Sequence, residues 1–215
     1  MDYDVCIMLF LEQRNAHTVI AMMPLDTLDK LYQIAEAQAG YFTTGQAEAA
    51  GVDRPCLSRY AAAGRLQRVR RGVYRLIHFP RSRREDLFIA WLETGPDSVI
   101  SHDSALALYD LSDALPAAIH LTVPRTASRR RHGLRLHTNQ ISPEDITNYE
   151  GLPVTTVART IADVALAGLS EEFVEQAVRE AVAAGLVLPS DLLTAAGRSG
   201  RRVRQVVHRA LERVG

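Results

Sequence analysis

Ten arginines crowd into residues 41–84, a segment that holds only two acidic residues, whereas the whole chain of 215 residues has no formal net charge. The two acids are Glu48 and Asp53. Basic residues concentrated in one segment of a neutral chain indicate a module that binds a polyanion and is attached to a part with another role. The arginines of this segment are Arg54, Arg59, Arg65, Arg68, Arg70, Arg71, Arg75, Arg81, Arg83 and Arg84.

The cysteines and the N-terminal residues indicate the cellular compartment in which the protein works. Cys6 and Cys56 are far apart and form neither a disulfide framework nor a metal-ligand spacing, which is typical of a reducing compartment. The apolar run Val5–Leu11 is too short to span a membrane, and Asp2 and Asp4 stand where a signal peptide carries basic residues. We therefore expect a cytoplasmic protein with no membrane partner. Residues 1–24 show no clear period and are interpreted as an arm or a mis-assigned start.

Three short helices are predicted at the start of the basic module. Apolar residues recur at helical spacing from Leu28 onward, and Gly40 ends this run. Thr43 or Thr44 caps a second helix, and Pro55 suits the first turn of a third because that turn leaves backbone N–H groups unpaired. The predicted helices comprise residues 28–39, 45–50 and 55–63.

Two short helices joined by a turn that contains glycine are typical of a helix-turn-helix. On the third helix, Leu57 and Tyr60 lie on one face and are expected to pack inward. Arg54, Ser58 and Arg59 project from the opposite side, where a recognition helix presents polar side chains to base edges in the major groove. We assign these three residues to sequence recognition.

Residues 65–76 are predicted to form a hairpin that turns at Gly72, where a positive backbone angle is needed. Apolar residues alternate imperfectly with arginines along it, so one face is expected to be half-buried and the other basic. Such a hairpin after a recognition helix is a wing, suited to phosphate contact. About six phosphate contacts would give a log–log salt slope near −5. The predicted wing and phosphate contacts are Thr43, Thr44, Arg65, Arg68, Arg70, Arg71 and Arg75.

A solvated arginine face on a structural domain is the simpler alternative, because isolated charge runs usually have that role. The ordered combination of turn, helix and basic hairpin favours DNA binding instead. Cys56, which has no neighbouring histidine in the sequence, is interpreted as a small packing residue rather than a nucleophile.

The sequence after Pro80 changes character, because Arg81–Arg84 is followed by a segment with net negative charge. A helix is predicted over Glu85–Thr94, and the mostly helical C-terminal half ends in an apolar stripe within Gly200–Arg213. Short strands are predicted at 98–101, 119–123 and 134–138, and further helices at 102–108, 157–167 and 171–184. The fold class is therefore α+β, with a winged helix-turn-helix over residues 25–80 and a mixed domain with a small sheet over 81–215.

His102, Asp103 and Asp163 are residue types that acid–base chemistry uses, but adjacency in sequence does not establish the geometry that such chemistry needs. Ser101 or His102 is expected to cap the following helix, and Arg159 with Asp163 to form a surface pair four residues apart. No phosphate-binding glycine loop or metal-ligand cluster is evident. We expect no enzymatic activity, no metal and no cofactor; a degenerate nuclease is the remaining enzymatic alternative.

Three stretches together resemble one family, the AbiEi antitoxins of type IV toxin–antitoxin systems linked to abortive phage infection. The similarity covers about Leu25 to the C-terminus. The first stretch joins Leu57-Ser58-Arg59-Tyr60 to Arg71-Gly72-Val73-Tyr74-Arg75-Leu76. The second and third are Ile100-Ser101-His102-Asp103-Ser104-Ala105-Leu106 and Gly151-Leu152-Pro153-Val154-Thr155-Thr156-Val157-Ala158-Arg159-Thr160-Ile161-Ala162-Asp163.

The resemblance implies a winged-helix domain that represses its own operon by binding double-stranded DNA at inverted repeats. It also implies a C-terminal domain that neutralises a cognate nucleotidyltransferase-like toxin. A stand-alone regulator whose second domain senses a ligand or partner is the alternative. Further basic residues are candidates for toxin or DNA contact, or else form a solubilising surface: Arg129, Arg130, Arg131, Arg201, Arg202, Arg204 and Arg209.

Overall fold

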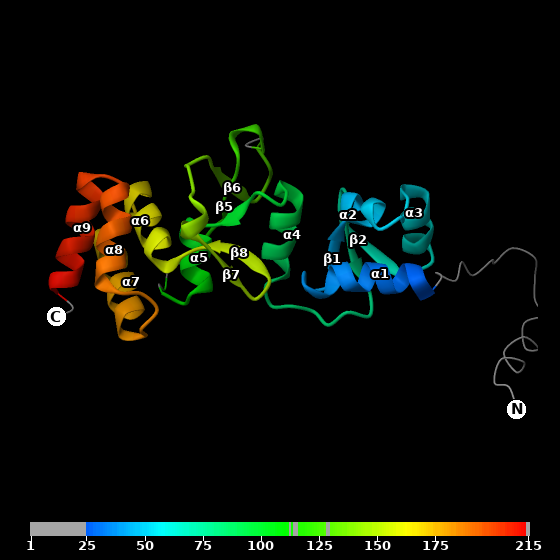
Figure 1. Cartoon of the computed structure of the whole chain (residues 1–215), viewed down its shortest axis with the longest axis horizontal. Coiled ribbons are helices and arrows are strands. Elements are labelled where there is room, and N and C mark those ends of the chain that lie inside the picture. Colours follow the sequence, from blue (N-terminus) through cyan, green and yellow to red (C-terminus); the bar gives the residue numbers. More distant parts are fainter. Residues whose placement is uncertain (1–24, 112, 114–115, 128–129, 214–215) are drawn as a thin grey trace, which may run out of the picture.

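The computed structural model describes residues 25–111, 113, 116–127 and 130–213 of the chain. Its parts follow one another along the long axis of the molecule: a small unit of helices and strands, then a second sheet, then a helical bundle at the C-terminal end (Figure 1). This is the α+β class predicted from the sequence, with the helical C-terminal half in the expected place. The prediction for residues 1–24 lies outside the described residues.

The N-terminal unit has the topology of a winged helix-turn-helix, with its three helices packed on a three-stranded antiparallel sheet of order β1-β3-β2. The strand β1 was not predicted, because three residues are too few to show a period. The elements of this unit are α1 (Leu25–Glu36), β1 (Tyr41–Thr43), α2 (Thr44–Ala49), α3 (Arg54–Ala62), β2 (Leu66–Arg70) and β3 (Val73–Leu76).

One face of this sheet packs against the three helices. Leu31, Phe42 and Leu57 are fully buried there, and the rings of Phe42 and Tyr74 stack with centroids 6.0 Å apart. Each such side chain stabilises the fold by about 1.5–3 kcal/mol when it leaves water. This cluster fixes α3 relative to the hairpin β2–β3.

The other face of the same sheet is covered by α4 (Glu85–Thr94). Tyr41 and Val73 point to this side and share a hydrophobic cluster with Phe88 of α4. The central strand β3 is therefore buried on both faces, and all four of its residues are buried. A side chain on either face of β3 is therefore shielded from solvent.

The second sheet has five strands in the order β6-β5-β4-β8-β7. The pairs β4–β8 and β5–β6 are parallel, and the pairs β4–β5 and β7–β8 are antiparallel. The helix α5 (His102–Leu108) follows β4 directly and packs on β5. The strands are β4 (Val99–Ile100), β5 (Ile119–Thr122), β6 (Leu134–His137), β7 (Ile146–Tyr149) and β8 (Leu152–Thr155), with short 3-10 helices at Arg125–Ala127 and Pro143–Asp145.

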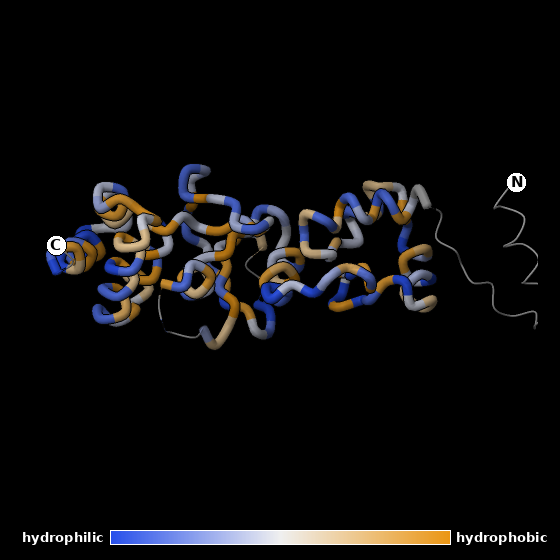
Figure 2. The backbone as a smooth tube through the Cα atoms, turned by 90° about the horizontal axis from the view of Figure 1, so that it is seen from below, coloured by the Kyte–Doolittle hydropathy of each residue, from blue (hydrophilic) through white to orange (hydrophobic). Residues whose placement is uncertain are grey.

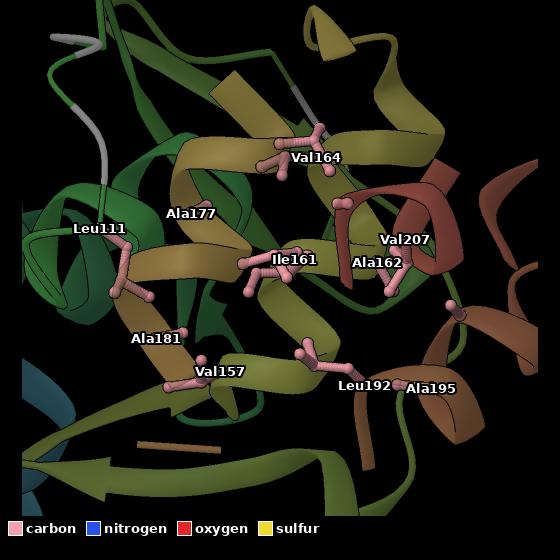
Figure 3. Packing of buried hydrophobic residues seen from close by; sticks show 14 of the residues in the cluster. Leu111, Val157, Ile161, Ala162, Val164, Ala177, Ala181, Leu192, Ala195 and Val207 are labelled. Carbon is pink, nitrogen blue, oxygen red and sulfur yellow. The ribbon is translucent and has the colours of Figure 1, made fainter. Parts of the chain in front are cut away.

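The helical bundle buries small side chains at close helix–helix contacts. Ile161 lies at its centre, with Ala177, Leu192 and Val207 around it (Figure 3). On the last helix the predicted stripe is confirmed for Val203, Val207 and Ala210, which are buried, whereas the arginines of this helix are exposed. Hydrophobic and hydrophilic colours accordingly alternate along the tube near the C-terminus in Figure 2. The helices are α6 (Val157–Ala167), α7 (Glu171–Ala183), α8 (Pro189–Arg198) and α9 (Arg201–Glu212).

Polar contacts hold the start of α4 to both the winged-helix unit and the second sheet. The hydroxyl of Tyr41 donates a hydrogen bond of 3.0 Å to Glu85 Oε2 at the start of α4. Arg84 pairs with Glu150 in the turn between β7 and β8, and its guanidinium lies 5.0 Å from the centroid of the Tyr149 ring. The apolar cluster and the Tyr41–Glu85 hydrogen bond therefore link the winged-helix unit to the rest of the chain across the predicted boundary at residue 80, and Arg84 holds the start of α4 to the second sheet.

The turn between β7 and β8 contains Gly151 (φ 88°) and approaches the end of α1 closely. A Cβ at position 151 would lie 2.5 Å from the carbonyl oxygen of Ala37, whereas a Cβ at Gly168 (φ 91°) would meet nothing within 4 Å. Both glycines have the same backbone strain for alanine. Only position 151 adds a steric conflict between the two parts of the chain.

We expect Gly151→Ala to destabilise the protein by about 1–3 kcal/mol more than Gly168→Ala, because only the former pushes α1 away from the β7–β8 turn. Urea unfolding of both variants beside the wild type measures this difference. Equal loss of stability in the two variants would contradict the close contact between Gly151 and Ala37.

Candidate nucleic-acid interface

The helix-turn-helix is shaped by hydrogen bonds from side chains to the backbone. Thr43 and Gln46 form a reciprocal capping box at the start of α2, in which Thr43 Oγ1 accepts from the Gln46 backbone N–H and Gln46 Oε1 accepts from the Thr43 N–H. Asp53 caps α3 by accepting a hydrogen bond of 2.9 Å from the Cys56 N–H. Gly51 (φ 86°) makes the turn between them. These local signals explain why α2 and α3 form where the sequence predicts them.

The two faces of α3 are divided as predicted. Leu57 and Tyr60 are buried against the sheet, while Arg54, Ser58 and Arg59 are exposed. The geometry of a recognition helix is thus present, and the assignment of these three residues to base reading stays a prediction.

The exposed arginine side chains of α3 make only weak interactions within the chain. Arg54 Nε donates to Glu48 Oε1 at 2.8 Å, but the Arg54 side chain is 75% exposed. Such a surface pair contributes about 0–1 kcal/mol, so a phosphate or a base can replace Glu48. Arg59 extends along the helix, where its Nη2 donates to Cys56 Sγ at 3.3 Å. Cys56 itself packs at the edge of the winged-helix core, in the packing role predicted for it.

The wing is formed by β2 and β3, and its tip is Arg70-Arg71-Gly72 with Gly72 at φ 81°. The tip lies beside the start of α2, because the Thr44 N–H and Thr44 Oγ1 both donate to the Gly72 carbonyl, at 2.8 and 3.3 Å. Thr43 and Thr44 are half-buried and engaged within the fold. The exposed basic residues of the hairpin are Arg65, Arg68, Arg70 and Arg71.

Arg75 does not fit the phosphate-contact role that the sequence suggested. It is only 5% exposed, and its guanidinium donates to the carbonyl oxygens of Ile77 and Phe79 beneath the ring of Tyr41. The reason is that β3 is the central strand and α4 covers the face on which Arg75 lies. A guanidinium with these intramolecular partners holds the segment after β3 and has no route to DNA.

The basic residues proposed as contacts in the second domain differ in exposure and in ion pairing. Arg129 lies outside the described residues. Arg130 is exposed and Arg131 is half-buried in the segment between β5 and β6. On α9, Arg209 pairs with Glu171 at 2.9 Å, so its charge is compensated by α7. The remaining residues of that set, Arg201, Arg202 and Arg204, are exposed at the start of α9.

The pair Arg159–Asp163 is not on the surface as predicted. Asp163 is 1% exposed, and Arg159 Nε donates to its Oδ1 at 3.0 Å, while Arg159 Nη1 donates to Asp145 Oδ2 at 3.0 Å. Arg198 of α8 completes the network by donating to Asp145 Oδ1 at 2.8 Å. Burial raises the pKa of Asp163, while the positive charge of Arg159 acts in the opposite direction. The network is buried because the 3-10 helix before β7 and the helix α8 both close over α6.

A second polar cluster was missed by the sequence analysis. His102 of α5, His120 of β5 and His137 of β6 lie together, and Asp103 Oδ2 is 3.5 Å from His120 Nε2. Ser101 stands at the N-cap of α5, but its hydroxyl makes no cap hydrogen bond and instead contacts His102 Nδ1 at 2.9 Å. Neither residue therefore has the capping bond that was expected. Eighteen and seventeen residues separate these histidines in the chain, and no local pattern reveals their proximity.

The described part of the chain contains neither a metal-ligand cluster nor a membrane-spanning helix. Within those residues, no group of three or more His, Cys, Asp or Glu side chains is arranged to hold a metal ion. Among the same residues, no helix combines the length and the apolar character that crossing a membrane requires.

Comparisons with known proteins bear on the winged-helix unit and on the fold. Residues 29–77 match the model of a family described as transcriptional regulator, AbiEi antitoxin. No curated protein matches the chain. The RV2827C protein from Mycobacterium tuberculosis has a similar crystal structure, with a TM-score of 0.54 at 14% identity over 90% of this chain and 78% of that one. The resemblance to the AbiEi antitoxins inferred from sequence motifs is thus confirmed over residues 29–77, the winged-helix unit.

Proposed function

We propose that this protein is a DNA-binding antitoxin that represses its own operon and neutralises a nucleotidyltransferase-like toxin encoded beside it. The observation that carries the proposal is the winged-helix unit itself. Its helix α3 exposes Arg54, Ser58 and Arg59, its wing tip exposes Arg70 and Arg71, and its residues 29–77 match a family of antitoxin transcriptional regulators.

In this proposal α3 enters the major groove and the wing lies along the phosphate backbone. An arginine that contacts guanine through two hydrogen bonds contributes about 1–3 kcal/mol of discrimination, so α3 supplies specificity. The arginines of the hairpin contact phosphates and supply affinity that is independent of sequence. Repression follows when the bound unit occupies the promoter, and a pair of inverted repeats would seat two copies of the chain.

Removing the wing charges by Arg70→Ala with Arg71→Ala should weaken binding to every duplex alike and reduce the slope of log affinity against log salt by about 2, because each lost phosphate contact reduces it by about 0.9. Fluorescence anisotropy at four salt concentrations, with the chain's own promoter and a scrambled duplex, measures both effects. In this proposal α9 makes no contact with DNA, so the control variant Arg201→Ala with Arg202→Ala, which removes the same charge from α9, should leave the slope unchanged. A loss confined to the promoter duplex would mean that the wing reads bases.

The antitoxin role is tested by co-expressing the chain with the product of the adjacent gene. We expect the chain to rescue the growth that the adjacent product arrests, and a promoter fusion to be repressed in the same cells. The variant carrying Arg54→Ala and Arg59→Ala should lose repression and keep rescue when it is expressed from an independent promoter. Repression without rescue would contradict the antitoxin role and leave a stand-alone regulator.

A further inference from the structure

Three histidines of the second domain, distant in sequence, form one contact cluster. The rings of His102 and His137 stack with centroids 3.5 Å apart and an interplanar angle of 9°. His137 Nε2 lies 3.4 Å from His120 Nδ1. His102 and His120 are buried, and His137 is half-buried. We refer to these three residues as the histidine cluster.

The contacts between the rings of the histidine cluster suit uncharged imidazoles. Ser101 Oγ accepts a hydrogen bond of 2.9 Å from Thr122 Oγ1 and lies 2.9 Å from His102 Nδ1, so it holds the His102 ring in place. Between His120 and His137, one facing nitrogen must accept, so double protonation of both would oppose two N–H groups. Two stacked imidazolium rings at 3.5 Å would also repel each other.

The surrounding charges do not compensate for protonation of the whole cluster. Asp103 of α5 faces His120, whereas Arg135 of β6 and Arg159 of α6 add positive potential. Burial, followed by the neighbouring histidines, lowers the pKa of His102 to about 3. Burial and His120 lower the pKa of His137 to about 4. Burial also lowers the pKa of His120, although Asp103 acts in the opposite direction.

The backbone at the cluster is held in an unfavourable conformation. His102 has φ 52°, a left-handed value that costs a residue with a side chain about 1–2 kcal/mol. Such strain persists only where the surrounding structure holds the residue in place, and it is often found at switch positions. The ring stack on His137 and the Ser101 contact are the interactions that hold this ring.

We propose that the histidine cluster is an acid-sensitive latch that secures the edge strand β6 to the second domain. Among the strands that the structure describes, β6 pairs with β5 alone, so the cluster supplies side-chain contacts that a second neighbouring strand would otherwise add. Protonation of the latch loosens β6 from its C-terminal end, where His137 lies. The latch makes the attachment of β6 to β5 depend on pH.

The sign of the effect follows from the two states. In the closed state the pKa values of these histidines lie below the ordinary value near 6.5, and in the open state they return to it. The latch is therefore fully effective above about pH 6.5. It weakens as the pH falls toward the closed-state values, because the open state takes up protons first. Each histidine released contributes about a tenfold shift in the opening equilibrium per pH unit in this window.

Hydrogen–deuterium exchange of the peptide over residues 134–137 tests the latch, at pH 7.5 and 5.5 and after correction for intrinsic exchange rates. The wild type should lose protection by at least about tenfold at pH 5.5 in this peptide, with no comparable change in α7. In His137→Gln the dependence on pH should shrink by about tenfold. The control His132→Gln replaces an exposed histidine that precedes β6 and lies outside the histidine cluster, and it should behave as the wild type.

Two outcomes would overturn the latch. One is equal protection of residues 134–137 in the wild type at both pH values. This outcome is measured on the wild type alone, so it does not depend on whether a variant folds. The other is an unchanged dependence on pH in His137→Gln, which would assign the acid sensitivity to other groups.

Discussion

Replacing Arg54 and Arg59 together by alanine should weaken binding to the chain's own promoter by about 5- to 150-fold per side chain, and leave the fold intact. Both residues are exposed on α3, so their removal opens no cavity. Each good contact of an arginine with a base contributes about 1–3 kcal/mol, and the loss should be larger for the promoter than for a scrambled duplex. Gel-shift titrations at matched salt measure both affinities.

The control for this variant is Arg201→Ala with Arg202→Ala, which removes two exposed charges at the opposite end of the molecule (Figure 1). If net charge alone governed binding, the two double variants would lose the same affinity. Unchanged promoter affinity in the α3 variant would refute the assignment of α3 as the recognition helix.

Arg159→Met should produce the largest loss of stability among these variants, about 3–5 kcal/mol, because it leaves buried carboxylates without their partner. Asp163 and Asp145 are each at most 2% exposed, and Arg159 donates to both. Arg198 keeps its contact with Asp145, so the unpaired charge falls mainly on Asp163. Urea unfolding followed by circular dichroism measures the loss.

Arg209→Met is the matched control, because Arg209 also pairs with a glutamate but its side chain is 54% exposed. Its loss should be about 0–1 kcal/mol. The stability deficit of Arg159→Met should also shrink at low pH, where protonation removes the unpaired charge of Asp163. A deficit that is small, or equal to that of the control, would contradict the buried network.

Local signals in the sequence were sufficient for the elements that begin with a cap or end at a glycine. The helices His102–Leu108 and Val157–Ala167 have the predicted bounds, and the helix-turn-helix differs from prediction by a residue or so at each end. The hairpin β7–β8 was not predicted, although Glu150 and Gly151 both have the positive φ of a type I′ turn. Each of its two strands has four residues, and so short an alternation of apolar and polar residues is not distinguishable from the pattern of the neighbouring helical segments.

The functional residues were predictable only where neighbours in sequence determine exposure. On α3 the helical period separates Arg54 and Ser58 from Leu57. The prediction failed for Arg75, because the covering of β3 by α4 is a tertiary contact between segments that share no local pattern. The histidine cluster and the network of Asp145, Arg159, Asp163 and Arg198 are assembled in the same way, each from residues on three elements. Periodicity along the chain contains no information about such contacts.

Amide chemical-shift mapping of the full chain with its own promoter duplex tests the central claim most directly. The account predicts that shifts concentrate on α3, near Arg54, Ser58 and Arg59, and on the wing tip Arg70-Arg71-Gly72. The helices α6 and α7 should be unaffected. Shifts confined to the second domain, or an absence of saturable binding at low salt, would contradict a role for the winged-helix unit in DNA recognition.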